Sequence, residues 1–178
     1  MLLAKFIFQT LMGWTISGQF SKNVLKTVVM VVPHTSWHDF YVGIFVRKIL
    51  NTQINYVGKK ELFDSPLGWY FKWVGGEPID RNSKQNKVEQ IVDMFESHDE
   101  FRLAIAPEGT RKKVEKWKTG FYYIAQSANV PITPVSFDYS TKTVKIGEPF
   151  YTTGDFENDL LVLKSFFKGV VGKVPEYT

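Results

Sequence analysis

The chain has 178 residues, with 22 Lys and Arg against 18 Asp and Glu, so 22 − 18 gives a formal net charge of +4 at pH 7. Hydrophobic residues make up 44% and charged residues 22%, which are ordinary fractions for one globular domain with a sizeable core and exclude disordered, collagen-like and repeat architectures. The chain has no Cys, which excludes a disulfide framework, a thiolate zinc site and a cysteine nucleophile. Aromatic residues reach 16%, and this content together with a mild positive charge favours a membrane surface or an anionic, apolar ligand.

Residues 1–20 form the most apolar stretch, and their pattern predicts one amphipathic helix. A narrow polar stripe on this helix consists of Lys5, Gln9, Gly13 and Ser17. The stripe interrupts the run of about 20 apolar residues that a membrane-spanning helix needs. We therefore expect a helix lying in the membrane interface, with Trp14 at the head-group boundary. The pattern leaves open a core helix packed on the domain that follows, residues 21–178.

After residue 24, short β-branched runs alternate with helical patterns, which is typical of an α/β fold with a mainly parallel mixed sheet flanked by helices. Extended segments are predicted at residues 25–32, 54–57, 77–79, 102–106, 132–138 and 143–146. Helices are predicted at residues 39–50, 66–74, 83–97, 119–129 and 157–167. The last two strands are predicted to pair as a hairpin. No internal repeat or linker composition is present, so the sequence favours a single domain.

The segment PHTSWHDF, residues 33–40, follows the first predicted strand. Functional groups of open α/β sheets gather beyond the carboxyl ends of strands. The spacing of His34 and Asp39 lets the carboxylate accept a hydrogen bond from one ring nitrogen, which leaves the other nitrogen as a base for an alcohol proton. A helix-capping Asp beside a turn His is the structural alternative.

His38 lies four residues after His34, so a metal site with two His and the neighbouring Asp39 is a second interpretation. Pro33 places His34 in the turn before the helix, whereas a helical H-x-x-x-H site needs both rings on one helix. The sequence therefore disfavours a metal site. His38 is expected either to support the site formed by His34 and Asp39 or to be exposed.

Two short segments carry arginine at a turn, GGEPIDR at residues 75–81 and PEGTR at residues 107–111. The residues that the second turn is expected to expose at the sheet edge are Glu108, Thr110 and Arg111. A guanidinium presents a planar fork of donors that matches phosphate oxygens, so Arg81 and Arg111 are candidates to hold a phosphomonoester. A surface turn with a Glu–Arg ion pair is the alternative for either segment alone.

Nucleotide chemistry is disfavoured, because the chain has neither a Walker A loop nor a G-x-G-x-x-G turn. Only the modest net charge and the lysines of residues 112–118 favour nucleic acid, and such a run is more often a solvated face. We therefore expect no nucleic-acid partner.

In order and spacing, these segments resemble the glycerolipid acyltransferase family, which includes 1-acylglycerol-3-phosphate acyltransferases. The matching motifs are H-x-x-x-x-D at residues 34–39, the segment ending Ile-Asp-Arg at 76–81, PEGTR at 107–111 and VPITPV at 130–135. Four motifs in the right order make the resemblance specific, and the match runs from about residue 31 to 135, which is most of the chain.

The resemblance implies transfer of an acyl group from acyl-CoA or acyl carrier protein to the hydroxyl of a glycerolipid such as lysophosphatidic acid, without a further cofactor. His34 would be the general base, Asp39 its orienting partner, and the segment around Pro131 would contact the acyl donor. The residues implied to bind the polar head of the acceptor are Arg81, Glu108, Gly109, Thr110 and Arg111. The aromatic residues at 69–73 would line an acyl slot or pack in an ordinary core.

These implications place the protein at the cytoplasmic face of a membrane, as a peripheral protein whose residues 21–178 are the acyltransferase domain. Pro33, the pair Glu77–Pro78 and Lys112 depart from the commoner residues of the family, which leaves open a lyso-lipid with another head group. A catalytically silent lipid-binding protein of the same fold and a metal-dependent hydrolase remain as alternatives.

Overall fold

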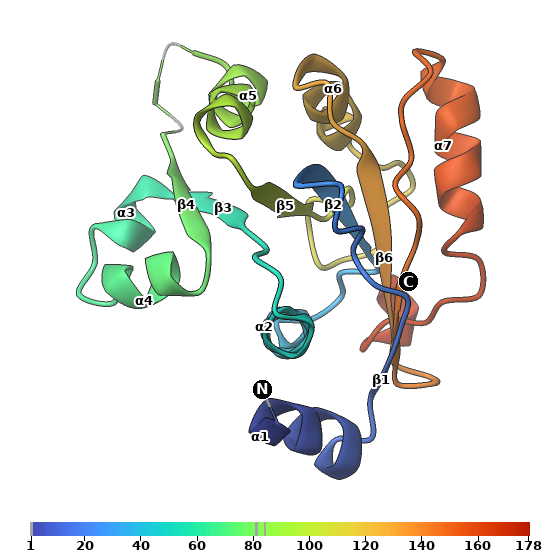
Figure 1. Ribbon diagram of the computed structural model, residues 1–178. Helices are drawn as coiled ribbons and strands as arrows, with labels where there is room; N and C mark the ends of the chain where they lie inside the picture. Colours follow the sequence, from blue (N-terminus) through green and yellow to red (C-terminus); the bar gives the residue numbers. More distant parts are fainter. Residues whose placement is uncertain (1, 81, 84) are drawn as a thin grey trace.

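A mixed five-stranded sheet forms the centre of the fold in a computed structural model, which describes residues 2–80, 82–83 and 85–178 (Figure 1). Its strands are β1 (Thr15–Ser17), β2 (Lys26–Val32), β5 (Phe101–Ile105), β6 (Ile132–Asp138) and β7 (Thr143–Ile146). They are ordered β1-β7-β6-β2-β5, with β2 parallel to both β5 and β6, β1 parallel to β7, and β6 and β7 paired as an antiparallel hairpin. The predicted mainly parallel mixed sheet and its terminal hairpin are confirmed.

A second, two-stranded parallel sheet extends the first at the β5 edge. Its strands are β3 (Tyr56–Lys59) and β4 (Gly76–Ile79), flanked by the short helices α3 (Lys60–Phe63) and α4 (Gly68–Trp73). Asn55 makes the connection: its N–H donates to Arg102 O at 2.7 Å, and its carbonyl accepts from Ala104 N at 2.8 Å. The strand predicted at 54–57 therefore begins two residues later, as β3, and pairs with β4. Asn55, just before it, bridges the two sheets.

Helices cover both faces of the large sheet (Figure 1). On one face lie α5 (Lys87–Ser97), α6 (Gly120–Ser127) and α7 (Phe156–Ser165); on the other lie α2 (His38–Leu50) and the N-terminal segment; a short 3-10 helix, η2 (Pro175–Tyr177), ends the chain. Helix α5 begins at Lys87 rather than at residue 83 because Asn86 caps it, with reciprocal bonds between Asn86 and Glu89.

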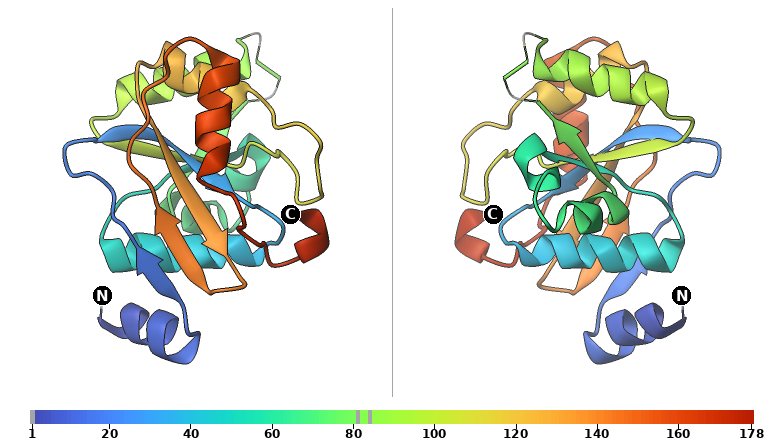
Figure 2. Two further views of the ribbon diagram at one scale, coloured as in Figure 1. Left: turned by 90° about the vertical axis from the view of Figure 1, so that its right-hand side faces the viewer. Right: turned by 90° about the vertical axis from the view of Figure 1, so that its left-hand side faces the viewer.

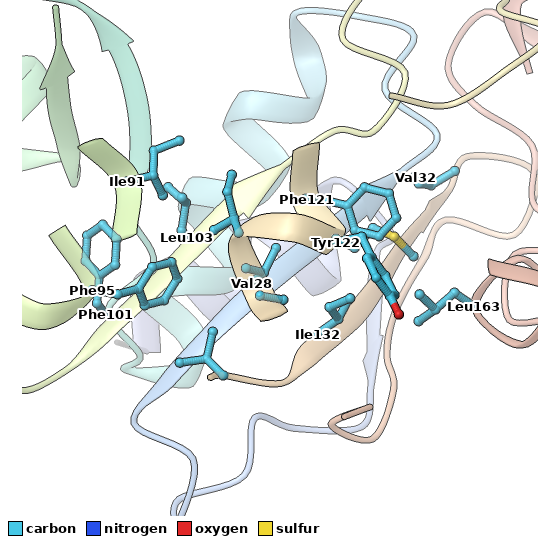
Figure 3. Packing of buried hydrophobic residues seen from close by; sticks show 14 of the residues in the cluster. Val28, Val32, Ile91, Phe95, Phe101, Leu103, Phe121, Tyr122, Ile132 and Leu163 are labelled. Atoms are coloured by element: carbon cyan, nitrogen blue, oxygen red, sulfur yellow. The ribbon is translucent and has the colours of Figure 1, made fainter. Parts of the chain in front are cut away.

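Strand β2 explains the two-sided core, because successive side chains of a strand point to opposite faces. Val28 and Met30 belong to the cluster under α5, α6 and α7, whereas Val29 belongs to the cluster under α2. Figure 3 shows the first cluster, in which Val28 and Ile132 lie between the aromatic side chains of the helices and strands around them. A strand buried on both faces reads as an unbroken apolar run, as residues 25–32 do.

The N-terminal segment is shorter than the predicted helix over 1–20. The α-helix α1 (Leu2–Lys5) continues as one π-helical stretch, η1 (Phe6–Leu11), and the helix ends there. Gly13 turns the chain with φ +72°, and β1 then joins the edge of the sheet beside β7. The prediction of a helix through residue 20 is wrong because the β-branched Thr15 and Ile16 find a strand partner.

The two faces of this short helix differ sharply. Phe8 is fully buried against α2, and Trp14 is only 4% exposed, so Trp14 lies in the core and not at a head-group boundary as predicted. Leu2 and Leu3, by contrast, are 82% and 71% exposed. Figure 2 shows this helix beside α2 at the periphery of the molecule. The core alternative therefore holds for part of the segment, while its outer face is unpartnered in the part of the chain that the structure describes.

Candidate active site

His34 and Asp39 come together where β2 turns into α2. The chain leaves the sheet after Val32, and α2 begins at His38, so the intervening turn brings the imidazole over the first turn of the helix. His34 Nδ1 lies 2.9 Å from Asp39 Oδ2, and the side chains are 28% and 2% exposed. Because a carboxylate only accepts, Nδ1 carries the proton and Nε2 is left as the basic nitrogen. The hydrogen bond predicted from the five-residue spacing is present.

Three donors fix the Asp39 carboxylate. Besides His34, the N–H of Ser36 donates to Oδ2 at 3.0 Å, and the hydroxyl of Tyr139 donates to Oδ1 at 2.7 Å. The negative charge also lies at the N-terminal end of α2, where the helix dipole favours it. The carboxylate is thereby held in one orientation, and with it the imidazole. Tyr139 was missed from the sequence, since nothing local marks a hairpin-turn tyrosine as a neighbour of Asp39.

Glu108 is buried rather than exposed at the sheet edge as the sequence analysis expected. Its Oε2 accepts the backbone N–H of His34 at 2.8 Å, which ties the end of β5 to the turn after β2. Burial raises the pKa of the Glu108 carboxyl, while the bond from His34 opposes that rise. Glu108 thus holds the main chain of the candidate base.

The PEGTR turn leaves its last residues exposed. Gly109 adopts φ +64°, and its N–H donates to Ala106 O at 3.1 Å, so this position needs a residue that tolerates the left-handed region. Thr110 and Arg111 follow it and are exposed, beyond the edge of the sheet at which the parallel strands β2 and β5 both end. Arg81, the other half of the predicted phosphate clamp, lies outside the described residues.

Pro131 lies away from this site. It precedes β6, and its carbonyl accepts Val28 N at 3.0 Å and Thr27 Oγ1 at 2.9 Å. With a rise of about 3.3 Å per residue, the five steps from Pro131 to Ser136, the partner of Val32, correspond to roughly 16 Å along the strand. The structure therefore does not bring Pro131 together with His34, and its observed contacts are structural.

An apolar cavity of about 250 Å³ opens beside the His34–Asp39 pair, between α2 and the sheet. Asp39, Gly43 and Arg47 lie four residues apart along its α2 wall, so this wall runs for about 12 Å at 1.5 Å per residue. The opposite wall consists of apolar residues of β2, β5 and β6, namely Val29, Val31, Ala104, Ile105, Val135 and Phe137. We call this cavity the α2 slot. An apolar slot that ends at a base is suited to a hydrocarbon chain whose head must react.

The aromatic residues at 69–73 do not line the α2 slot, and Trp69 and Trp73 are exposed on α4. Gly43 is the slot residue with a recognisable signal in the sequence, because glycine inside a helical pattern costs stability and usually has a packing or functional reason. A Cβ at Gly43 would meet no atom within 4 Å. Helix α2 has no side chain at this position, so the slot remains open one turn below Asp39.

His38 does not join His34 around Asp39. Its Nδ1 lies 2.9 Å from Ser36 Oγ, and its exposed ring lies against Trp37 at a tilt of 31°. No group of three or more His, Asp or Glu side chains with metal-binding geometry occurs within residues 2–80, 82–83 and 85–178. Over the same residues, no helix is both long and apolar enough to cross a bilayer.

Comparisons with known proteins point to one family. The family model described as "Acyltransferase" matches residues 15–138. Lysophosphatidylcholine acyltransferase of Drosophila melanogaster is 31% identical over 138 residues, which cover 72% of this chain and 24% of that protein. The 1-acyl-sn-glycerol-3-phosphate acyltransferase of Bacillus subtilis is 29% identical over 113 residues, which cover 61% of this chain and 54% of that protein. The chain thus spans about a quarter to a half of the length of these relatives.

A solved structure shares the fold. The crystal structure of the 1-acyl-sn-glycerophosphate (LPA) acyltransferase PlsC from Thermotoga maritima matches with a TM-score of 0.61 and 22% identity, over 96% of this chain and 78% of that chain. The likeness therefore extends over nearly the whole chain and shows a common fold.

Proposed function

The chain belongs to the acyltransferase family, and from this premise we propose that it transfers a fatty acyl group from a thioester donor to the hydroxyl of a lysophospholipid. The observation that carries the proposal is the His34–Asp39 pair at the mouth of the α2 slot, with Nε2 free of hydrogen bonds from the described residues. The donor is acyl-CoA or acyl carrier protein, and the relatives' names supply the acceptor class, a lysophospholipid such as lysophosphatidic acid.

In the proposed reaction, His34 Nε2 removes the proton from the acceptor hydroxyl as its oxygen attacks the thioester carbonyl. The carbon–sulfur bond then breaks, and the proton held by His34 passes to the leaving thiolate. Asp39 stabilises the imidazolium between these steps, since its carboxylate already bonds Nδ1. Thr110 and Arg111 are suited to contact the phosphate of the acceptor, and Arg81 is their predicted partner.

The test is release of free thiol from acyl-CoA and from acyl carrier protein, each with a panel of lyso-lipids in mild detergent. Release that depends on an acceptor, with the acylated lipid as product, supports the transferase. Thiol release at the same rate without an acceptor would favour a hydrolase. No release with any pair, from folded protein, would favour a silent lipid-binding protein.

We assign the acyl chain to the α2 slot, and Gly43 provides the test. Gly43→Leu is expected to fill the slot one turn below Asp39 and to lower kcat/KM for a palmitoyl donor about tenfold or more, while kcat/KM for a short butyryl donor is retained. Gly43→Ala is the matched control, because its single methyl group meets nothing within 4 Å. Equal losses for both donors with Gly43→Leu would place the acyl chain elsewhere.

We further propose that the outer face of the N-terminal helix rests on the cytoplasmic face of a membrane. Leu2 and Leu3 expose apolar side chains that a lipid interface would bury. Changing both to Ser is expected to weaken partition to phospholipid vesicles by about tenfold or more, since burying one Leu contributes about 1.5–3 kcal/mol. The matched control changes Leu161 and Val162, exposed on α7, to Ser. Equal weakening by both pairs would argue against docking through the N-terminal helix.

A further inference from the structure

Tyr139 links the candidate catalytic pair to a distant part of the chain. It follows β6 directly, a hundred positions after Asp39, and its hydroxyl donates to Asp39 Oδ1 at 2.7 Å. His34 and Ser36 both bond Oδ2, whereas Tyr139 bonds the other oxygen, Oδ1. A carboxylate fixed at both oxygens cannot rotate about its last bond without breaking a hydrogen bond.

Two other segments hold Tyr139 itself. Its N–H donates to Val171 O at 2.8 Å, and its ring and the Trp14 indole form an edge-to-face pair with a centroid distance of 4.9 Å and an angle of 89°. Trp14 in turn stacks on Phe8 of the N-terminal helix. Burial, followed by the bond to Asp39, raises the pKa of the Tyr139 hydroxyl, which favours the protonated form that donates to Asp39.

We propose that Tyr139 is a positioning residue for the acyl transfer: through Asp39 it holds the His34 imidazole in the tautomer that carries its proton on Nδ1. This inference rests on the proposed function, in which Nε2 must be unprotonated to accept the hydroxyl proton. Without the Tyr139 bond, the carboxylate gains a free oxygen and rotational freedom. A misoriented carboxylate holds the ring less firmly, so fewer enzyme molecules present a basic Nε2 to the substrate.

Tyr139→Phe tests the proposal because it keeps the ring and its contact with Trp14 and removes only the hydroxyl. Loss of one hydrogen bond to a charged group is expected to lower kcat about ten- to a hundredfold, with KM for both substrates unchanged. The KM values are expected to remain unchanged because Tyr139 is not among the residues that line the α2 slot and does not belong to the PEGTR turn.

Tyr122→Phe is the matched control. The Tyr122 hydroxyl donates to Asp159 Oδ2 at 2.8 Å, and Asp159 is a buried carboxylate that also bonds the backbone and hydroxyl of Thr153. Tyr122 belongs to the core cluster on the other face of the sheet, where Figure 3 shows it. Both variants lose one tyrosine–carboxylate bond, so both are expected to lose stability, but only Tyr139→Phe is expected to lose kcat. Equal losses of kcat would overturn the proposal in favour of general loosening.

A second readout does not depend on turnover. Nitrogen NMR of the histidine rings, with His34 assigned by its absence in His34→Ala, is expected to show one Nδ1–H tautomer in the wild type and a mixture in Tyr139→Phe. An unchanged His34 tautomer together with an unchanged kcat would overturn the role of Tyr139. If the wild type transfers no acyl group at all, the proposed function fails, while the tautomer comparison still decides whether Tyr139 positions His34.

Discussion

Replacing His34 by Ala is expected to abolish acceptor-dependent thiol release, with kcat falling by at least about 10²–10⁴, the usual contribution of a positioned general base. The imidazole is the group in the described site that combines a bond to a buried carboxylate with a free basic nitrogen at the α2 slot. Folding is expected to survive, because the side chain is partly exposed and its removal opens no buried void. Thermal unfolding of the variant, measured beside the wild type, checks this point.

The matched control is His38→Ala. His38 lies in the same turn, but its ring bonds Ser36 and not Asp39, so the variant is expected to retain most of the wild-type kcat. If both variants lost activity equally, and stoichiometric zinc, iron or manganese were found in the wild type, the metal-dependent hydrolase would displace the transferase.

Replacing Phe8 by Ala is expected to lower the free energy of unfolding by about 3–5 kcal/mol, the range for removing a fully buried Phe. The Phe8 ring stacks at 5.8 Å from Trp14 and 5.5 Å from Phe45 of α2, and no part of it is exposed. Denaturant unfolding monitored by circular dichroism gives the measurement.

Phe6→Ala is the control for this prediction, because Phe6 belongs to the same helical turn but is exposed. It is expected to change stability by no more than about 0.5 kcal/mol. Similar small effects of both variants would mean that the N-terminal helix is a detachable anchor. A large effect of Phe8→Ala alone means that deleting residues 1–20 removes part of the core, so membrane binding has to be tested by point substitutions on the outer face.

The sequence predicts the parts of this fold that depend on local pattern. The apolar run of β2, the hairpin of β6 and β7 and the spacing of His34 and Asp39 can each be recognised within 15 consecutive residues or fewer, and the structure has them all. The prediction of one helix over 1–20 is wrong because the turn at Gly13 and the strand after it depend on the edge that β7 offers. The position of this segment could not be decided either, because its apolar residues are equally compatible with an interface and a core.

Long-range contacts account for what the sequence leaves out. Tyr139 and Asp39 are separated by a hundred positions, and Glu108 meets His34 only because β2 and β5 are parallel neighbours whose ends coincide. The depth of the α2 slot depends on how α2 sits over the sheet, which no local pattern contains. Gly43 alone carries a local signal, as a glycine within a helix.

The burial of Glu108 changes how mutational data on this motif have to be read. A carboxylate that supports the main chain of His34 can abolish the proposed activity when replaced, even without any contact with a substrate. Loss of activity in a Glu108 variant would then indicate that His34 is displaced. Loss of activity in a variant of the exposed Arg111 would instead indicate that the proposed contact with the acceptor phosphate is missing. Two residues of one short motif can thus cause the same loss of activity for unrelated reasons. Only the dependence of the reaction rate on substrate concentration distinguishes the two cases.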